Sequence, residues 1–189
     1  MGLKCMNKKI YVIRHCATDY NLSNLISGGS DVSIVNKNVE LACNIRQKEH
    51  FRVYSSPMKR CVQTEQVLEE YLSIVSLKLD ERLKEREMGI FDGMDRGFCK
   101  KRWPGMFNKQ GKFIKDKTPP EGEKFDEFYN RVLEFWESIQ GELSESNIIV
   151  ISHNQTLKIL YSIVCKKNLE DVWQKINFVN GQLIELNIL

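Results

Sequence analysis

Two histidines of the sequence stand at the ends of apolar runs. Arg14 and His15 follow the run 10–13, and His153 follows the run 148–151 with one serine between them. A charged arginine at the end of a buried strand is costly unless an anionic group pairs with it. Either histidine alone would fit a hydrogen-bonded core residue. Together with the arginine, they indicate one anion site that contains two imidazoles.

Arg60 is a second arginine that could bind the same anion. Ser56 and Pro57 are typical of a helix start, with serine as the N-cap and proline at the first helical position. Arg60 would then lie in the first turn, near the positive end of the helix dipole. The planar guanidinium suits phosphate oxygens. A phosphoryl group neutralised by two arginines is open to in-line attack by a neutral imidazole nitrogen.

A departing alkoxide would need a proton, which a carboxylic acid can supply. Glu85, just after an apolar and polar alternation at 74–79, is the candidate for this general acid. Glu87 is the competing carboxyl group. The spacing to Gly89 and Gly93 favours Glu85.

The elements that must position these residues alternate between strands and helices. The expected strands are 8–14, 52–55, 74–79, 147–152 and 182–188, and the expected helices are 40–49, 57–72, 123–139, 156–164 and 171–176. This order predicts an α/β fold, a three-layer α/β/α sandwich with a mostly parallel central sheet. Ligands of such sheets bind at the C-terminal ends of the strands, where His15, Ser55 and His153 fall.

Residues 81–122 are rich in glycine and proline and are expected to be irregular. We call residues 90–122 the lid segment and expect it to be an insertion within a single domain, 1–189. Eight basic residues and one acidic residue fall within 96–117, which gives this stretch a charge of +7 in a chain of net charge +3. These cations either lie in solvent or steer an anionic substrate toward the site.

Composition excludes several classes of protein. The apolar runs are far shorter than the roughly 20 residues of a membrane helix, and the N-terminus lacks the apolar region of a signal peptide. Gly2 lacks the serine or threonine that follows in a myristoylation signal. Six cysteines without a C-x-x-C pair predict reduced, cytoplasmic thiols and neither a disulfide framework nor a zinc site. The basic stretch lacks a recognisable nucleic-acid-binding module.

Six ordered motifs give the sequence a family resemblance that spans almost the whole chain. They are Arg14-His15-Cys16-Ala17-Thr18-Asp19-Tyr20-Asn21, Ser27-Gly28 with Asp31, Ser55-Ser56-Pro57 with Arg60 and Thr64, Glu85 with Gly89 and Gly93, Pro119 to Glu123 followed by 125–132, and Ile151-Ser152-His153. In this order they resemble the phosphoglycerate mutase-like branch of the histidine phosphatase superfamily.

The resemblance implies a role for each motif residue. His15 would be the nucleophile that forms a phosphohistidine, and Glu85 the general acid and then the base for water. Arg14, Arg60 and His153 would bind the phosphoryl oxygens. The residues expected to contact substrate are Asn21, Thr18, Ser27, Gly28, Arg86, Asn154 and Gln155. No metal and no organic cofactor are implied, and the partner would be a small phosphomonoester rather than a nucleic acid or a membrane.

Several functions fit this resemblance. The first is a phosphatase acting on a small metabolite, and the others within the family are an α-ribazole phosphatase and a cofactor-dependent phosphoglycerate mutase. Cys16 and Ala17 stand where the family usually has glycine and glutamate, which leaves a weakly catalytic phosphoprotein-binding module as the alternative of another class. Cys16 beside the nucleophile is either a small core filler or an oxidation-sensitive thiol.

Overall fold

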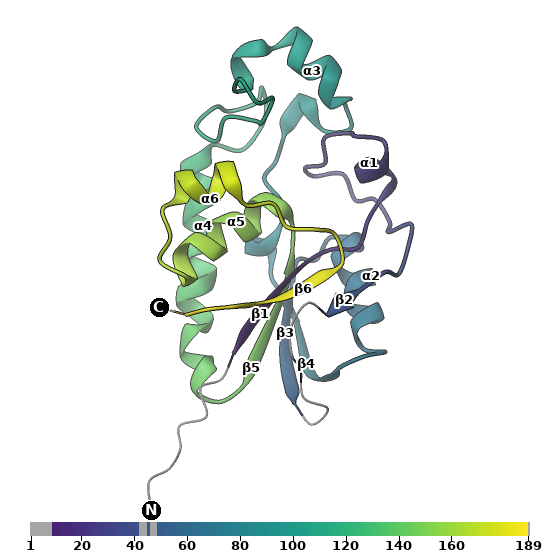
Figure 1. Ribbon diagram of the computed structural model, residues 1–189, viewed down its shortest axis with the longest axis vertical. Helices are drawn as coiled ribbons and strands as arrows, with labels where there is room; N and C mark the ends of the chain where they lie inside the picture. The colour runs from purple at the N-terminus through teal and green to yellow at the C-terminus, as the bar shows by residue number, and fades with distance from the viewer. Residues whose placement is uncertain (1–8, 42–44, 46–48, 189) are drawn as a thin grey trace, which may run out of the picture.

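The computed structural model describes residues 9–41, 45 and 49–188, and within them a six-stranded sheet forms the middle layer (Figure 1). Its strands are β1 (Ile10–Arg14), β2 (Glu40–Leu41), β3 (His50–Ser55), β4 (Ser73–Leu79), β5 (Asn147–Ser152) and β6 (Gln182–Leu186). The order across the sheet is β2-β6-β1-β5-β3-β4, and only the β1–β6 pairing is antiparallel. The predicted mostly parallel sheet is confirmed.

Helices cover both faces of this sheet, as the three-layer prediction requires. They are α1 (Asp19–Leu22), α2 (Lys59–Leu68), α3 (Arg96–Arg102), α4 (Phe125–Ile139), α5 (Asn154–Val164) and α6 (Leu169–Lys175). Ile10 and Val12 of β1 pack in one core with α4 and α5, and Tyr11 and Ile13 pack in the other with α2. Because both faces are buried, the central strands read as continuous apolar runs and not as alternations.

One predicted element was wrong in type, and the bounds of others differ by one to four residues. Glu40 and Leu41, expected in a helix, form β2; the expected helix residues 42–44 and 46–48 lie outside the described residues, as do Gly2, Cys5 and Cys43. Helix α2 begins at Lys59, not at Pro57, because its N-cap is Met58 and the carboxylate of Asp31 accepts a hydrogen bond from the Lys59 amide at 2.6 Å. A carboxylate from a distant loop was invisible to local capping rules.

The lid segment is more ordered than its composition suggested. It contains α3, and its residues Phe91, Phe107 and Phe113 are buried in a small apolar cluster that also includes Ile26 and Met88 of the body. Figure 1 shows this segment standing above the C-terminal ends of the strands. The expectation that 81–122 is irregular was therefore wrong for the stretch around α3, since several spaced aromatic residues bury enough area to fix short turns.

Gly89 is the position where the lid segment joins the body most closely. Its φ is +51°, and a Cβ atom there would lie 2.0 Å from the carbonyl oxygen of Pro120. Only glycine satisfies both the left-handed backbone and this close approach. Among the described helices, none combines the length and the apolar character needed to cross a membrane.

Candidate active site

The C-terminal ends of three strands meet at one edge of the sheet. Arg14 lies opposite Ser152 in the register, and Ser55 lies opposite Ile151. The backbone amides of His15 and Ser56 continue the ladders, donating to Ser152 and Ile151 at 3.0 Å each. The structure therefore brings His15, Ser55 and His153 together at the strand ends, as predicted. The ring centroids of the two histidines lie 5.2 Å apart.

The hydrogen bonding of His15 leaves one ring nitrogen available. Nδ1 lies 2.7 Å from the carbonyl oxygen of Cys16, and only an N–H can bond to a carbonyl there. The proton is therefore on Nδ1, which gives Nε2 the lone pair. Burial, followed by the charges of Arg14 and Arg60, holds the pKa of His15 well below its usual 6.5. The ring is neutral near pH 7.

His153 is engaged at both ring nitrogens. Arg60 donates from Nε to Nδ1 at 3.2 Å, so the ring proton lies on Nε2, which donates to the hydroxyl of Ser56 at 2.9 Å. Burial and the charge of Arg60 lower the pKa of His153 well below its usual value. His153 therefore lies beside His15 as a neutral ring that orients a buried guanidinium.

Arg60 is completely buried and bonded to a loop of the body. Its two Nη atoms donate to the carbonyl oxygens of Ser30 at 2.6 Å and Gly28 at 3.1 Å. The carboxylate of Asp92, from the lid segment, accepts from the amides of the same two residues at 2.6 and 2.7 Å. The loop that follows the Arg-His motif is thus held from two sides, by a cation and by an anion.

Glu85 lies against the N-terminus of α5. Its Oε1 accepts from the amides of Arg86 and Thr156 and from the Thr156 hydroxyl, at 3.1 to 3.3 Å. Within the described part of the chain, its Oε2 accepts only from the amide of Gln155, at 3.2 Å. Helix N-termini stabilise carboxylates in this position. Oε2, with one bond, is the oxygen that has capacity for a proton or for a substrate oxygen.

The main chain that carries Glu85 is fixed by a helix residue. Arg131 of α4 donates to the carbonyl oxygens of Arg82, Lys84 and Glu85 at 2.7 to 3.0 Å and forms an ion pair with Glu123 at 2.7 Å. Glu87, the competing carboxyl group in the sequence, is exposed, whereas Glu85 is buried. The structure therefore favours Glu85 over Glu87.

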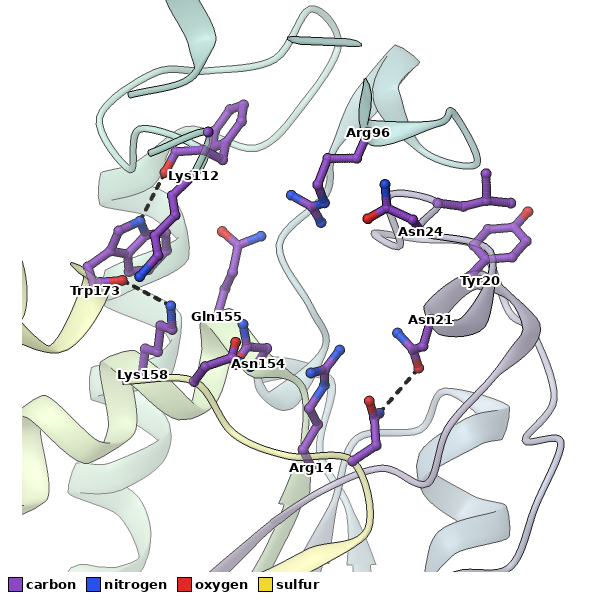
Figure 2. Close-up of a pocket in the computed structure, with 15 residues that line it drawn as sticks. Arg14, Tyr20, Asn21, Asn24, Arg96, Lys112, Asn154, Gln155, Lys158 and Trp173 are labelled. Atoms are coloured by element: carbon purple, nitrogen blue, oxygen red, sulfur yellow. Dashed lines mark hydrogen bonds between the residues drawn. The ribbon is translucent and has the colours of Figure 1, made fainter. Parts of the chain in front are cut away.

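A cavity of about 450 Å³ opens beside Arg14, between the strand ends and the lid segment (Figure 2). It is lined by Arg14, Tyr20, Asn21, Asn24, Leu25, Arg96, Gly111, Lys112, Phe113, Asn154, Gln155, Lys158, Trp173, Asn177 and Asn180. Four of these side chains are cationic, and none is acidic. We call His15, His153, Arg60 and Glu85 the histidine end of the site, and Arg96, Lys112 and Lys158 the lysine end.

Asn21 shows how the wall of the cavity is oriented. Its Oδ1 accepts from the amide and hydroxyl of Thr18 at 3.1 Å and from Nδ2 of Asn180 at 3.2 Å. The side-chain nitrogen Nδ2 of Asn21 therefore faces the cavity (Figure 2). Arg14 donates from Nη1 to the carbonyl oxygen of Phe178 at 3.0 Å, but its buried Nε has no hydrogen-bond partner among the described residues.

Cys16 packs as a core residue. It is fully buried, its amide donates to the hydroxyl of Thr64 at 2.8 Å, and burial raises the pKa of its thiol. Its φ is not positive, so the position does not require the family's usual glycine. Cys16, Cys61, Cys99 and Cys165 are all buried and free of disulfides.

Comparison with known proteins decides the family. The sequence profile of the Histidine phosphatase superfamily (branch 1) matches residues 10–188. The chain belongs to this superfamily. The family, the fold and the general class of enzyme that the sequence predicted are confirmed.

Relatives of this histidine phosphatase carry several activities. It is 25% identical to a 2,3-bisphosphoglycerate-dependent phosphoglycerate mutase of Cytophaga hutchinsonii, over 86% of this chain and 80% of the relative. It is 24% identical to phosphoserine phosphatase 1 of Hydrogenobacter thermophilus, over 87% and 80%. The crystal structure of the α-ribazole phosphatase from Shigella flexneri has the same fold, with a TM-score of 0.73 and 19% identity over 96% and 91% of the two chains.

The structure of this histidine phosphatase separates the expected substrate contacts into two groups. Asn21, Asn154 and Gln155 line the cavity. Thr18 instead caps α1, Gly28 bonds Arg60 and Asp92 through its backbone, and the hydroxyl of Ser27 is buried. These three do not line the cavity.

Arg86 is also outside the cavity. Its guanidinium is fully buried and donates to the carbonyl oxygens of Glu123, Lys115 and Lys117 at 2.8 to 3.0 Å. This arginine ties the end of the lid segment to the body. Arg86 was expected to contact substrate, whereas its side chain bonds these carbonyl groups and does not line the cavity.

Sequence analysis missed several residues of the cavity wall, and Lys158 and Asn180 are two polar examples. Lys158 lies five residues after His153 on α5 and so shares roughly the face of Asn154, which the helical period could have shown. Asn180 bonds the carbonyl of His15 at 2.8 Å as well as Asn21. No local signal marks Asn180, because its role depends on the β6 strand crossing beside β1.

Proposed function

We propose that this enzyme hydrolyses a phosphomonoester of a small metabolite by transferring the phosphoryl group to Nε2 of His15. The observation that carries this proposal is the fixed tautomer of His15. A neutral ring with Nδ1 bonded to a backbone carbonyl presents an unprotonated nitrogen to a ligand. The family membership of the chain supports the same chemistry.

Arg14 is the guanidinium with donors left for the phosphoryl group. Arg14 lies on the cavity wall, and among the described residues only its Nη1 has a hydrogen-bond acceptor, which leaves Nη2 for a phosphoryl oxygen. Arg60 acts mainly through its charge, since each of its three nitrogens already donates within the protein, to His153 and to the loop 28–30. Together they neutralise the group under attack.

Glu85 acts in both steps of the proposed reaction, as an acid in the first and as a base in the second. In the first, Nε2 of His15 forms a bond to phosphorus, the bond from phosphorus to the ester oxygen breaks, and a protonated Oε2 gives its proton to the leaving oxygen. In the second, water attacks the phosphohistidine, and the carboxylate takes the proton of that water. Inorganic phosphate leaves, and His15 and Glu85 return to their starting states.

The alternatives differ in what they demand of Glu85. A phosphoprotein-binding module needs no proton donor, so the buried and fully oriented Glu85 favours an enzyme. A mutase of the kind named among the relatives would return the phosphoryl group to a second hydroxyl instead of water. The α-ribazole phosphatase reading rests on fold alone. The single-domain organisation and the cytoplasmic location remain predictions from the sequence.

The test is phosphate release from a panel of phosphomonoesters that includes 3-phosphoglycerate, phosphoserine, α-ribazole phosphate, sugar phosphates and an aryl phosphate. The variant His15→Ala should lose at least about 10⁴-fold in kcat/KM. His50→Ala is the matched control, because His50 is exposed at the start of β3, away from the strand ends. Unchanged release by folded His15→Ala would overturn the proposal.

A further inference from the structure

The lysine end of the cavity carries positive charge that a single phosphoryl group does not use. Arg96 reaches into the cavity from the lid segment, and Lys112 and Lys158 come together at the side formed by α6 (Figure 2). None of the three forms an ion pair with a carboxylate in the described part of the chain. Cations left unpaired in a cavity wall are typical of a site for an anionic ligand.

The two lysines are held in place by the end of a helix. Lys158 donates from Nζ to the carbonyl oxygen of Trp173 at 3.0 Å, and Lys112 donates to the carbonyl oxygen of Gln174. Both acceptors lie in the last turn of α6, whose dipole favours cations. Each ammonium group uses one of its three donors in this way, which leaves the others for a ligand.

Capping of α6 alone does not account for this arrangement. One lysine would satisfy the dipole, whereas the second adds repulsion: the charge of Lys112, with those of Arg14 and Arg96, adds to burial in lowering the pKa of Lys158 to about 8. Gln155, between the two ends of the site, has a buried Oε1 without a hydrogen-bond partner among the described residues. Among the described residues, the cavity wall therefore lacks anionic acceptors for its cations and a hydrogen-bond donor for Oε1 of Gln155.

We propose that the substrate carries a second anionic group, a carboxylate or a second phosphate, which binds to Lys112, Lys158 and Arg96 while its phosphoryl group lies at His15. This inference rests on the proposed function, because it assigns one end of the substrate to His15. The substrate class is therefore a small metabolite with two anionic ends. Gln155 then accepts a hydrogen bond from a hydroxyl or amino group between these ends.

The test compares ligands that differ only in the second group. Each is an unbranched alkyl phosphate of two to five carbons that ends in a carboxylate, in the corresponding uncharged amide, or in a second phosphate. Dissociation constants are measured by calorimetry on His15→Ala, which binds without turnover, and kcat/KM is measured on the wild type. We expect at least one chain length at which an anionic end binds about tenfold or more tightly than the amide.

Substitutions of the two lysines test whether they cause the preference for an anionic end. Lys158→Gln and Lys112→Gln, each combined with His15→Ala for the binding arm, should reduce the preference for the anionic end to about twofold or less, without an equal loss for the amide. Lys112 is exposed, so this variant keeps the test valid if the buried Lys158→Gln fails to fold. Lys101→Gln is the matched control, an exposed lid lysine outside the cavity, and should keep the preference.

The outcomes separate this inference from the proposed function. Equal affinity for the anionic and amide ligands at every chain length would overturn it, even if the wild type hydrolyses them all. A preference that survives both lysine substitutions would overturn the assignment to these residues. A preference in binding without any hydrolysis would support the second anion site while contradicting the phosphatase proposal. A stronger preference for phosphate than for carboxylate, or the reverse, identifies the group.

Discussion

At the histidine end of the site, nearly every polar atom is bonded within the protein, whereas at the lysine end most donors face an open cavity. His153 uses both ring nitrogens, Arg60 uses donors on three nitrogens, and Glu85 accepts four hydrogen bonds. Arg96, by contrast, forms no ion pair in the described residues. One end is a preorganised reaction centre, and the other is a receptor that a ligand must complete.

The difference follows from how each end is built. The histidine end comes from strand ends whose positions are fixed by sheet register. The lysine end combines the lid segment, α5 and α6, which are far apart in the sequence. Preorganised donors serve transition-state stabilisation, while differences in the outer contacts decide which substrate is accepted. We therefore expect substitutions at the histidine end to lower kcat and those at the lysine end to change substrate preference.

The largest effect that distinguishes the two ends of the site is a loss of kcat when Glu85 is substituted. Glu85→Gln keeps the size of the side chain but removes the acid, so kcat for an alkyl phosphate should fall by about 10²–10⁴-fold. An aryl phosphate, whose leaving group needs little protonation, should lose much less in its first step. Glu87→Gln serves as the matched control in the same kinetic assay and should behave as wild type. Equal losses for alkyl and aryl phosphates in that first step would break the assignment of Glu85 as the leaving-group acid.

The attachment of the lid segment to the body is tested at Gly89. Gly89→Ala should lower the free energy of unfolding by about 2–4 kcal/mol, because the new Cβ meets the Pro120 carbonyl and the backbone is left-handed. Chemical denaturation measures this change. Gly105→Ala, also in the lid segment, has open space around its added Cβ and should change stability by less than about 1 kcal/mol. Similar losses in both variants would argue against the close approach.

A pH dependence should distinguish the lysine end. The pKa of Lys158 is lowered to about 8, so its charge is present below that pH and is lost as the pH rises through it. KM for a substrate with a second anion should therefore rise by up to about tenfold above pH 8, whereas KM for its amide analogue should not follow. Lys158→Arg, which stays charged, should abolish the rise. A rise of equal size for both substrates would place the titrating group elsewhere.

The smallest effect is expected at Cys16. Because its thiol is buried and its pKa is raised, little thiolate is present to react with peroxide. Wild type and Cys16→Gly should lose activity at the same rate during peroxide treatment. Selective protection of the glycine variant would show that the histidine end contains a redox-sensitive thiol after all.

Sequence reasoning succeeded where local patterns determine the structure. Apolar runs that end in Arg14-His15 and Ser152-His153 fixed both the sheet and the position of the histidines. It failed where distant residues determine the contacts: Asp31 caps α2, Asp92 holds the loop 28–30, and Arg86 binds carbonyls of the lid segment. The lysine end belongs to this second class, since the partners of Lys112 and Lys158 come from α6.

The central claim is that His15 carries the phosphoryl group during turnover. Its most direct test is intact-protein and peptide mass spectrometry of Glu85→Gln quenched during turnover of an aryl phosphate, because this variant should form the intermediate and hydrolyse it slowly. The account predicts one added phosphoryl group on the peptide containing His15, and none when His15→Ala is combined with Glu85→Gln. Phosphate release without any phosphorylated peptide, or phosphorylation of another residue, would contradict it.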